Sequence, residues 1–314
     1  MRIGIDIGGM SIKLGIVDDG NKIIAKKVIS TNSKEQSQTE IAEAIALAVC
    51  ELAEENEVEL SKCGCVGVAC PGTVDSGVGM VLYSNNLEWE NLPLIEIMKQ
   101  HIPAPMALAN DADAAALGEV LAGAAKDKKN AILLTLGTGV GGGVILDGRI
   151  FTGTLRGGCE LGHMVIRQGG KLCTCGRRGC LEQYASATAL MTAAREMAKQ
   201  NRDSLMVQLC GDDLEQLNGK HIFDAAQMGD AAAIAVIDEY EENLSEGIAN
   251  LINIFRPEIV ILGGGVSAQG KKLTDALQDK VNSMCFGGRH GEIPPIVTSA
   301  LGNDAGIIGA AYLC

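Results

Sequence analysis

The sequence has few aromatic residues and fewer basic than acidic ones. Only 3% of its 314 residues are Phe, Trp or Tyr, and seven are proline. Lysine and arginine number 26 against 39 aspartates and glutamates, so the formal net charge is −13. Such a chain repels phosphate backbones and anionic membrane surfaces, and no local basic patch is evident that would reverse this. Nucleic-acid binding is therefore a poor first hypothesis.

Long apolar runs are also missing. No stretch approaches the ~20 residues that a membrane-spanning helix needs. The N-terminal sequence MRIGIDIGGM is too short an apolar run for a signal peptide. We therefore expect a cytoplasmic protein whose 11 cysteines are reduced thiols. Those expected to be small core residues are Cys50, Cys63, Cys65, Cys70, Cys159, Cys210, Cys285 and Cys314.

What the sequence does have is glycine, 40 residues of it, within a composition that is 47% hydrophobic. Residues 3–28 and 131–151 both follow the pattern strand, glycine turn, strand, tight turn, strand. Each segment begins with an almost wholly aliphatic strand, as strands covered on both faces do. The pattern recurs after about 130 residues, which indicates two related α/β halves rather than a short-period repeat.

Strands and helices alternate along the rest of the chain. Predicted helices cover residues 37–56, 186–200, 231–254, 270–283 and the C-terminus, and predicted strands cover 64–70, 105–109 and 258–262, with a loop from Pro71 to residue 104. This order is typical of largely parallel sheets covered by helices. We expect an N-terminal α/β domain of residues 1–117, completed by residues 302–314, and a C-terminal α/β domain of residues 118–301. An interdomain cleft is expected, with hinges near residues 111–118 and 300.

Three glycine-rich turns follow predicted buried strands: Gly8-Gly9, Gly137-Thr138-Gly139 and Gly263-Gly264-Gly265. Without a Cβ, their backbone N–H groups can approach an anion closely. Residues 137–142 match the dinucleotide pattern G-x-G-x-x-G, but a strand rather than a helix is predicted to follow. Residues 265–272 nearly match a P-loop, but Lys272 replaces the Ser or Thr that would hold Mg²⁺. The paired turns instead favour a nucleotide site split between two halves.

One histidine and three cysteines lie within eighteen residues: His163, Cys173, Cys175 and Cys180. This is the ligand composition of a closed structural zinc site, whereas a catalytic zinc keeps one position open for water. Glycines and arginines separate the cysteines, which is typical of a polar loop and argues against three unrelated core thiols. We therefore predict structural Zn²⁺.

Seven motifs occur in a characteristic order: DIGGMSIKLG, CPGTVD, NDADAAALGE, LTLGTGVGGG, GCELGH, CTCGRRGCLE and LGGGVS. Together they resemble the ROK family (repressor, open reading frame, kinase) over essentially the whole chain, and within it the ATP-dependent bacterial glucokinases. The resemblance implies the two-domain actin-like (ribonuclease-H-like) fold and a homodimer. Family repressors carry a winged helix-turn-helix before the first motif. Asp6 is the sixth residue and leaves no room for one, so a kinase is expected.

The resemblance also implies a catalytic base and a sugar site. Asp111 corresponds to the family's base, and such a carboxylate can align a sugar hydroxyl with the γ-phosphate of ATP and take its proton. On the sequence alone, Asp111 fits a helix N-cap better. Asp113, further along, is expected to be a cap or solvated. Residues implied to contact the sugar are Asn110, Glu160, His163 and Glu182, with Gly72 and Asn86 as weaker candidates for lining the same pocket.

The nucleotide site follows from the same resemblance. Asp6 is expected to hold Mg²⁺ through water, near the β- and γ-phosphates. Gly8, Gly9, Ser11 and Lys13 are implied at one phosphate edge, Gly137, Thr138 and Gly139 at the other, and Gly264 and Gly265 at the adenosine. Met10 stands where the family usually has threonine, so a phosphate-contacting hydroxyl is missing there.

These residues predict transfer of the ATP γ-phosphate to the 6-hydroxyl of a hexose, with glucose as the first candidate. N-acetylmannosamine, fructose or allose could be the substrate instead. From other classes, a sugar sensor without turnover would be consistent with Met10. An actin-like filament protein would give no reason for the zinc loop.

Overall fold

The computed structural model describes residues 1–33, 35–154, 157–288 and 291–314. They form two compact units. The first comprises Met1–Leu133, Gly142–Cys159 and Ser299–Cys314, and the second comprises Leu134–Gly141 and Glu160–Thr298. The domain boundary expected after residue 117 falls inside helix α3 (Asp111–Ala122), all of which belongs to the first unit. Within the described ranges, no helix is long and apolar enough to cross a membrane.

The first unit is built on a sheet of order β3-β2-β1-β4-β8. Strands β1 (Arg2–Ile7), β2 (Ser11–Val17) and β3 (Ile23–Ser30) form the predicted antiparallel meander. Strands β4 (Val66–Cys70) and β8 (Met106–Asn110) follow, parallel to β1 and close to their predicted bounds. The carboxyl ends of β1, β4 and β8 therefore meet at one edge of the sheet.

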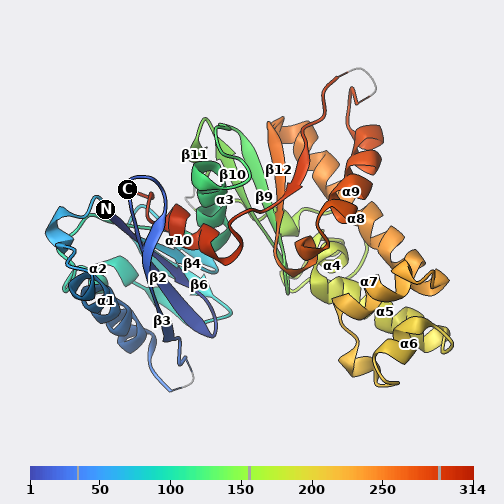
Figure 1. The fold of residues 1–314 in the computed structure, drawn as a ribbon, viewed down its shortest axis with the longest axis horizontal. Coiled ribbons are helices and arrows are strands. Elements are labelled where there is room, and N and C mark those ends of the chain that lie inside the picture. Colours follow the sequence, from blue (N-terminus) through green and yellow to red (C-terminus); the bar gives the residue numbers. More distant parts are fainter. Residues whose placement is uncertain (34, 155–156, 289–290) are drawn as a thin grey trace. The chain divides into compact units, whose positions relative to one another are not determined.

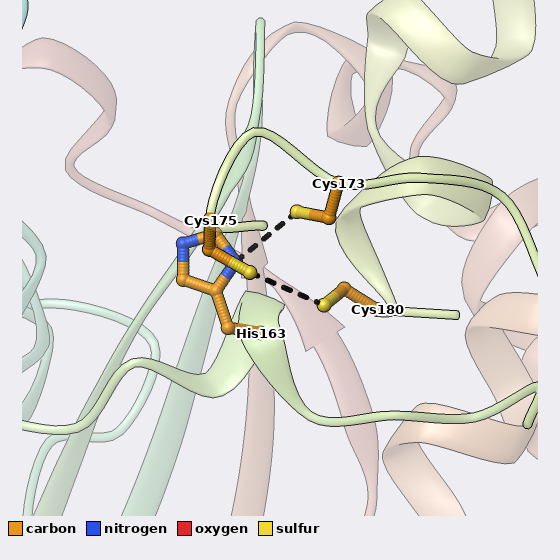
Figure 2. Close-up of side chains that lie close together, drawn as sticks. All are labelled: His163, Cys173, Cys175 and Cys180. Carbon is orange, nitrogen blue, oxygen red and sulfur yellow. Dashed lines mark hydrogen bonds between the residues drawn. The ribbon is translucent and has the colours of Figure 1, made fainter. Parts of the chain in front are cut away.

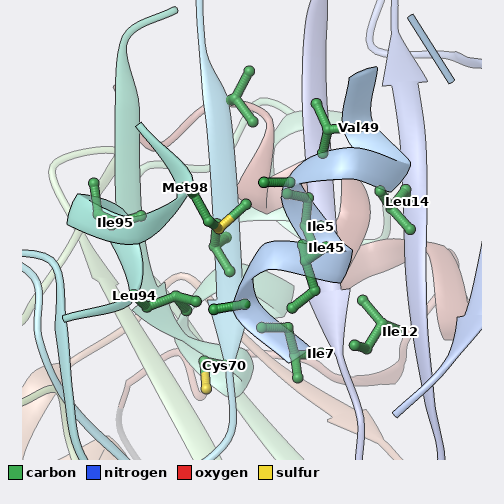
Figure 3. Close-up of a cluster of buried hydrophobic side chains, with 14 of the residues drawn as sticks. Ile5, Ile7, Ile12, Leu14, Ile45, Val49, Cys70, Leu94, Ile95 and Met98 are labelled. Carbon is green, nitrogen blue, oxygen red and sulfur yellow. The ribbon is translucent and has the colours of Figure 1, made fainter. Parts of the chain in front are cut away.

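The two faces of this sheet are packed differently because side chains alternate along each strand. The isoleucines of β1 point into a buried apolar cluster with helices α1 (Gln38–Glu55) and α2 (Leu94–Met98) (Figure 3). The opposite face meets helix α10 (Ala305–Ala310). A Cβ on Gly4 would lie 1.8 Å from the carbonyl oxygen of Ile307, and one on Gly67 would lie 1.7 Å from that of Ala310. Glycine at these positions therefore allows the helix to touch the sheet.

A small sheet that was not predicted lies between β4 and β8 in the sequence. Its strands are β5 (Thr73–Asp75), β6 (Met80–Ser84) and β7 (Trp89–Leu92), in that order. Gly72 precedes it with φ of 100°, and a Cβ there would lie 2.3 Å from the carbonyl oxygen of Tyr83. The loop expected over residues 71–104 is therefore largely structured.

The second sheet, of order β11-β10-β9-β12-β13, repeats the plan of the first (Figure 1). Its strands are β9 (Ala131–Leu136), β10 (Val140–Leu146), β11 (Arg149–Ile150), β12 (Ile259–Gly263) and β13 (Ile296–Thr298). The second unit carries α4 (Glu182–Ala185), α5 (Ala187–Gln200), α6 (Leu205–Leu209), α7 (Gly219–Gln227), α8 (Ala231–Phe255) and α9 (Lys271–Met284). The meander followed by parallel strands agrees with the predicted duplication, whereas β13 was missed.

The cysteine prediction is wrong for two residues, because Cys65 and Cys314 form a disulfide. They are 249 residues apart, and their Cα atoms are 5.6 Å apart because α10 brings the C-terminus to the start of β4. The cysteines that are free and buried as expected are Cys63, Cys70, Cys210 and Cys285. Cys50 and Cys159 are only half-buried, so they are not core residues.

Candidate active site

Two carboxylates converge at the edge where β1, β4 and β8 end. Asp6 lies near the end of β1, directly opposite Lys13 of β2, whose Nζ is 3.7 Å from Asp6 Oδ2. Burial raises the pKa of Asp6, and Lys13 opposes that shift. Burial also raises the pKa of the Cys70 thiol, and the charges of Asp111 and Asp6 raise it further. Both carboxylates are therefore close to the end of β4.

Asp111 is the first residue of α3, but it is not the N-cap. Asn110 takes that position, and its Oδ1 accepts the N–H of Ala112 at 2.8 Å and of Asp113 at 3.3 Å. Its Nδ2 donates to the carbonyl oxygen of Gly72 at 3.1 Å. Asn110 thus ties the Gly72 turn to the helix that presents Asp111, and the alternative role for Asp111 as an N-cap is wrong.

The first phosphate turn is held by its backbone. The N–H of Gly8 donates to the carbonyl oxygen of Ser11 at 3.0 Å, and Thr31 Oγ1 donates to the carbonyl oxygen of Gly8 at 2.6 Å. A Cβ on Gly9 would lie 3.5 Å from the carbonyl oxygen of Asn86, so these two residues are neighbours. The Met10 side chain is 89% exposed, and it packs against nothing that would explain methionine there.

Asp113 does not behave as expected for a solvated residue, because it is 2% exposed. A Cβ on Gly158 would lie 2.3 Å from its Oδ2, so this carboxylate lies against the chain two residues before Glu160. The alternating alanines and aspartates around Asp113 give no sign that the start of the helix is buried. The low exposure of Asp113 could therefore not be predicted from the sequence.

The second unit brings Glu182 to its phosphate turn. Glu182 is the first residue of α4, and its Oε2 accepts the N–H of Val140 at 3.2 Å. A Cβ on Gly139 would lie 2.3 Å from that oxygen, so the Glu182 carboxylate packs directly against this glycine. The carbonyl oxygen of Gly137 accepts the N–H of Ala187 at 2.9 Å, at the start of α5. Because strand β10 follows the turn, the dinucleotide-fold alternative is excluded.

Gly264 lies beside the same turn. It has φ of 83°, and a Cβ on it would lie 2.5 Å from the carbonyl oxygen of Leu136, where β9 ends. No Cβ contact restricts Gly265, which opens the 3₁₀ turn Gly265–Gln269. The second phosphate turn and the predicted adenosine residues are therefore neighbours at the carboxyl ends of β9 and β12.

The four predicted metal ligands form a cluster in the second unit (Figure 2). Their ligand atoms all lie within 4.8 Å of one another. Cys175 Sγ and Cys180 Sγ are 3.6 Å apart, and Cys173 Sγ is 3.5 Å from His163 Nδ1. A tetrahedral zinc site requires roughly 3.8 Å between two sulfurs and roughly 3.6 Å between sulfur and nitrogen. The cluster therefore has the donor set and the size that zinc needs.

The cluster also contacts Glu182, one of the residues predicted to bind the sugar. Cys173 Sγ donates to Glu182 Oε1 at 3.8 Å, and Glu182 follows Cys180 by two residues. His163 ends the 3₁₀ turn Leu161–His163, which the exposed Glu160 precedes. A metal held here would fix both ends of the segment that carries the two glutamates.

The predicted site residues fall into two sets. The first unit carries Asp6, Gly8, Gly9, Ser11, Lys13, Gly72, Asn86, Asn110 and Asp111, and the second carries Gly137, Thr138, Gly139, Glu160, His163, Cys173, Cys175, Cys180, Glu182, Gly264 and Gly265. In each set, glycine turns lie at the carboxyl ends of strands, where α/β proteins bind ligands: Gly8 follows β1, and Gly137 and Gly264 follow β9 and β12.

Comparison with known proteins agrees with this arrangement. Residues 2–314 match the ROK family. The chain belongs to this family. It is 39% identical to a glucokinase of Thermotoga maritima over 312 residues, which cover 99% of this chain and 96% of that protein. The similarity thus extends over nearly the whole length of both proteins.

Solved ROK structures are similar over the same length. The ROK glucokinase of Streptomyces griseus, solved with glucose and AMPPNP, is 34% identical with a TM-score of 0.82, covering 100% of this chain and 98% of that one. The ROK hexokinase of Thermus thermophilus is 31% identical with a TM-score of 0.84, covering 100% and 97%. The predicted α/β class with a two-domain actin-like fold is therefore confirmed.

Proposed function

We propose that this ROK protein is an ATP-dependent hexose kinase that phosphorylates the 6-hydroxyl of glucose. The observation that carries the proposal is full-length similarity to glucokinases, combined with a carboxylate at the start of α3 beside the half-buried Asp6. An anion or carboxylate at a helix N-terminus is stabilised by the backbone dipoles. This suits a base that must stay ionised until it receives a proton.

In this proposal Asp111 accepts the hydroxyl proton as the oxygen attacks the γ-phosphate of ATP. Asn110 keeps α3 and the Gly72 turn together, so that the base is held in place. Sugar hydroxyls are bound by Asn110, Glu160, His163 and Glu182, with Gly72 and Asn86 lining the pocket. Carboxylates suit this task because each can accept hydrogen bonds from two adjacent hydroxyls, which distinguishes epimers.

The phosphates are bound in this proposal by backbone N–H groups of the two glycine turns, with Ser11, Lys13 and Thr138 beside them, and the adenosine by Gly264 and Gly265. Asp6 would hold Mg²⁺, which neutralises phosphate charge when it is bound. The ion requires few protein ligands because ATP supplies the others. His163, Cys173, Cys175 and Cys180 would hold a structural Zn²⁺.

A coupled assay of ADP release across glucose, N-acetylmannosamine, fructose and allose tests this function. We expect glucose to have the highest kcat/KM of the four. A higher value for another hexose would change the assigned substrate. No turnover with any of them would support a sugar sensor instead. The homodimer and the cytoplasmic location stay predictions.

Restoring the usual threonine should improve nucleotide use. Met10→Thr places a hydroxyl in the first phosphate turn, where the methionine side chain is exposed and packs on nothing. One added hydrogen bond to a phosphate oxygen would lower the KM for ATP about threefold to tenfold. Steady-state kinetics with varied ATP measure this, and Met10→Ala is the control that removes the methionine without adding a donor. An unchanged KM in Met10→Thr would show that the backbone alone binds that phosphate.

A further inference from the structure

A fully buried carboxylate lies at the far end of the helix that begins with Asp111. Glu119 in α3 has 0% exposure. Its Oε2 accepts the N–H of Ala124 at 2.7 Å and of Ala300 at 3.1 Å, and its Oε1 accepts the N–H of Leu301 at 2.9 Å. Three charge-assisted hydrogen bonds compensate a buried carboxylate for the water it has lost.

Two of the three donors belong to a segment far away in the sequence. The chain leaves the second unit after Thr298, where β13 ends, and re-enters the first unit at Ser299. Ala300 and Leu301 are the next residues, so Glu119 fastens this re-entering segment to α3. Asp111 and Glu119 are eight residues apart on one helix, or about 12 Å along its axis.

The stability of α3 itself does not explain this glutamate. A negative charge near a helix C-terminus is unfavourable, and the last turn of α3 contains no basic residue to offset it. The local chain is nevertheless shaped around the carboxylate, because a Cβ on Gly123 would lie 2.0 Å from Glu119 Oε2. What the Glu119 carboxylate provides is a pair of hydrogen bonds, from the N–H groups of Ala300 and Leu301.

We propose that Glu119 is a positioning residue for phosphoryl transfer. Its hydrogen bonds to Ala300 and Leu301 hold the re-entering chain against the helix that carries Asp111. When the chain moves on substrate binding, the backbone therefore bends before Ala300, at Thr298 and Ser299. Asp111 then keeps its orientation when the enzyme closes around its substrates. This role rests on the proposed function, because it needs Asp111 to be the base.

The test replaces Glu119 by glutamine, which has nearly the same volume but lacks the charge and one acceptor. Asp230→Asn is the matched control. Asp230 is a carboxylate of the second unit that accepts the N–H of Leu205 at 2.6 Å and of Ala233 at 2.8 Å, and it is not a predicted site residue. Both variants should lower the melting temperature. Only Glu119→Gln should lower kcat per folded enzyme, about tenfold for a tenfold smaller fraction of correctly oriented base, with the KM for glucose close to the wild-type value.

Hydrogen exchange supplies a local measurement on the same proteins. In Glu119→Gln the amides of Ala124, Ala300 and Leu301 should exchange faster, with the rest of α3 protected. If glutamine prevents folding, Gly123→Ala keeps the charge and displaces the carboxylate, and it should lower kcat per folded enzyme and speed exchange at the same amides.

A merely structural Glu119 would lower the melting temperature and the folded fraction, with kcat per folded enzyme as in the wild type. That result, or wild-type exchange at Ala300 and Leu301 in both variants, would overturn the proposal. Failure of the proposed function would be recognised separately, because the wild-type chain would then phosphorylate none of the hexoses. Exchange at Ala300 and Leu301 does not depend on turnover, so it would still show whether Glu119 holds this segment.

Discussion

Asp111→Asn is expected to lower kcat about a thousandfold, because a positioned general base contributes on that order. Asparagine has the shape of aspartate but cannot take the hydroxyl proton. The N-cap of α3 is Asn110, so the helix start keeps its hydrogen bonds to Ala112 and Asp113. Loss of the charge from the first turn should cost only about 0.3–1 kcal/mol of stability. Glucose binding, measured by calorimetry, should change little.

The matched control is Glu40→Gln, which removes an exposed first-turn carboxylate from α1 in the same unit. Glutamine can still accept the N–H of Ser37, so the capping box is weakened rather than lost, and turnover should stay at the wild-type level. If Asp111→Asn also turned over at near wild-type rate, Asp111 would not be the base. Loss of both glucose binding and turnover would point instead to a sugar-binding role for its carboxylate.

The elements that the sequence predicted best are those with a regular pattern. In β1 and β4, aliphatic residues alternate with small ones, and the structure shows that the small ones face α10. The cluster of His163 and three cysteines was predictable because the spacing of these residues is short and their chemistry is unusual. The position of Asp6 near a strand end, two residues before Gly8, was visible in the sequence, whereas its proposed role follows from the family resemblance. In each case the signal is local in the sequence.

What the sequence did not predict depends on contacts between distant segments. The Cys65–Cys314 disulfide and the tie from Glu119 to Leu301 join positions 249 and 182 residues apart. The strands β5 to β7 are only 3 to 5 residues long, too short for a clear alternation. Asp113 was expected to be a cap or solvated because nothing near it in the sequence shows that Gly158 packs against it.

Loss of the zinc site is the second large effect that we expect. Cys175→Ser removes one of four ligands, and the variant should retain little of the about one zinc per chain that the wild type should contain. Between Met164 and Leu181, the backbone is joined by the bridges Val165–Cys180 and Leu172–Arg178 rather than by regular elements. Backbone hydrogen bonds hold separate turns of this loop, such as Cys173 N–H to the carbonyl oxygen of Arg177 at 2.8 Å, and the metal would join these turns through four side chains.

The consequence for the sugar site follows from Glu182. It lies two residues after Cys180, and its Oε2 accepts the N–H of Val140 beside the phosphate turn. A loosened loop would hold Glu182 in this position for a smaller fraction of the time. A tenfold smaller fraction raises the KM for glucose about tenfold. Zinc is not needed for proton transfer in this scheme, so kcat at saturating glucose should fall much less than in Asp111→Asn.

Cys210→Ser is the control, since Cys210 is a buried free thiol of the same unit outside the cluster. It should keep its zinc and its KM for glucose, whatever its effect on melting temperature.

Chelation of the wild type should reproduce the Cys175→Ser phenotype, and added Zn²⁺ should restore only the chelated wild type. If metal-free protein bound glucose with unchanged affinity, zinc would not be positioning Glu160 and Glu182. Metal analysis showing no zinc in the wild type would reject the site itself. The two results are distinct, because four ligands at zinc spacing can bind the ion without shaping the sugar pocket.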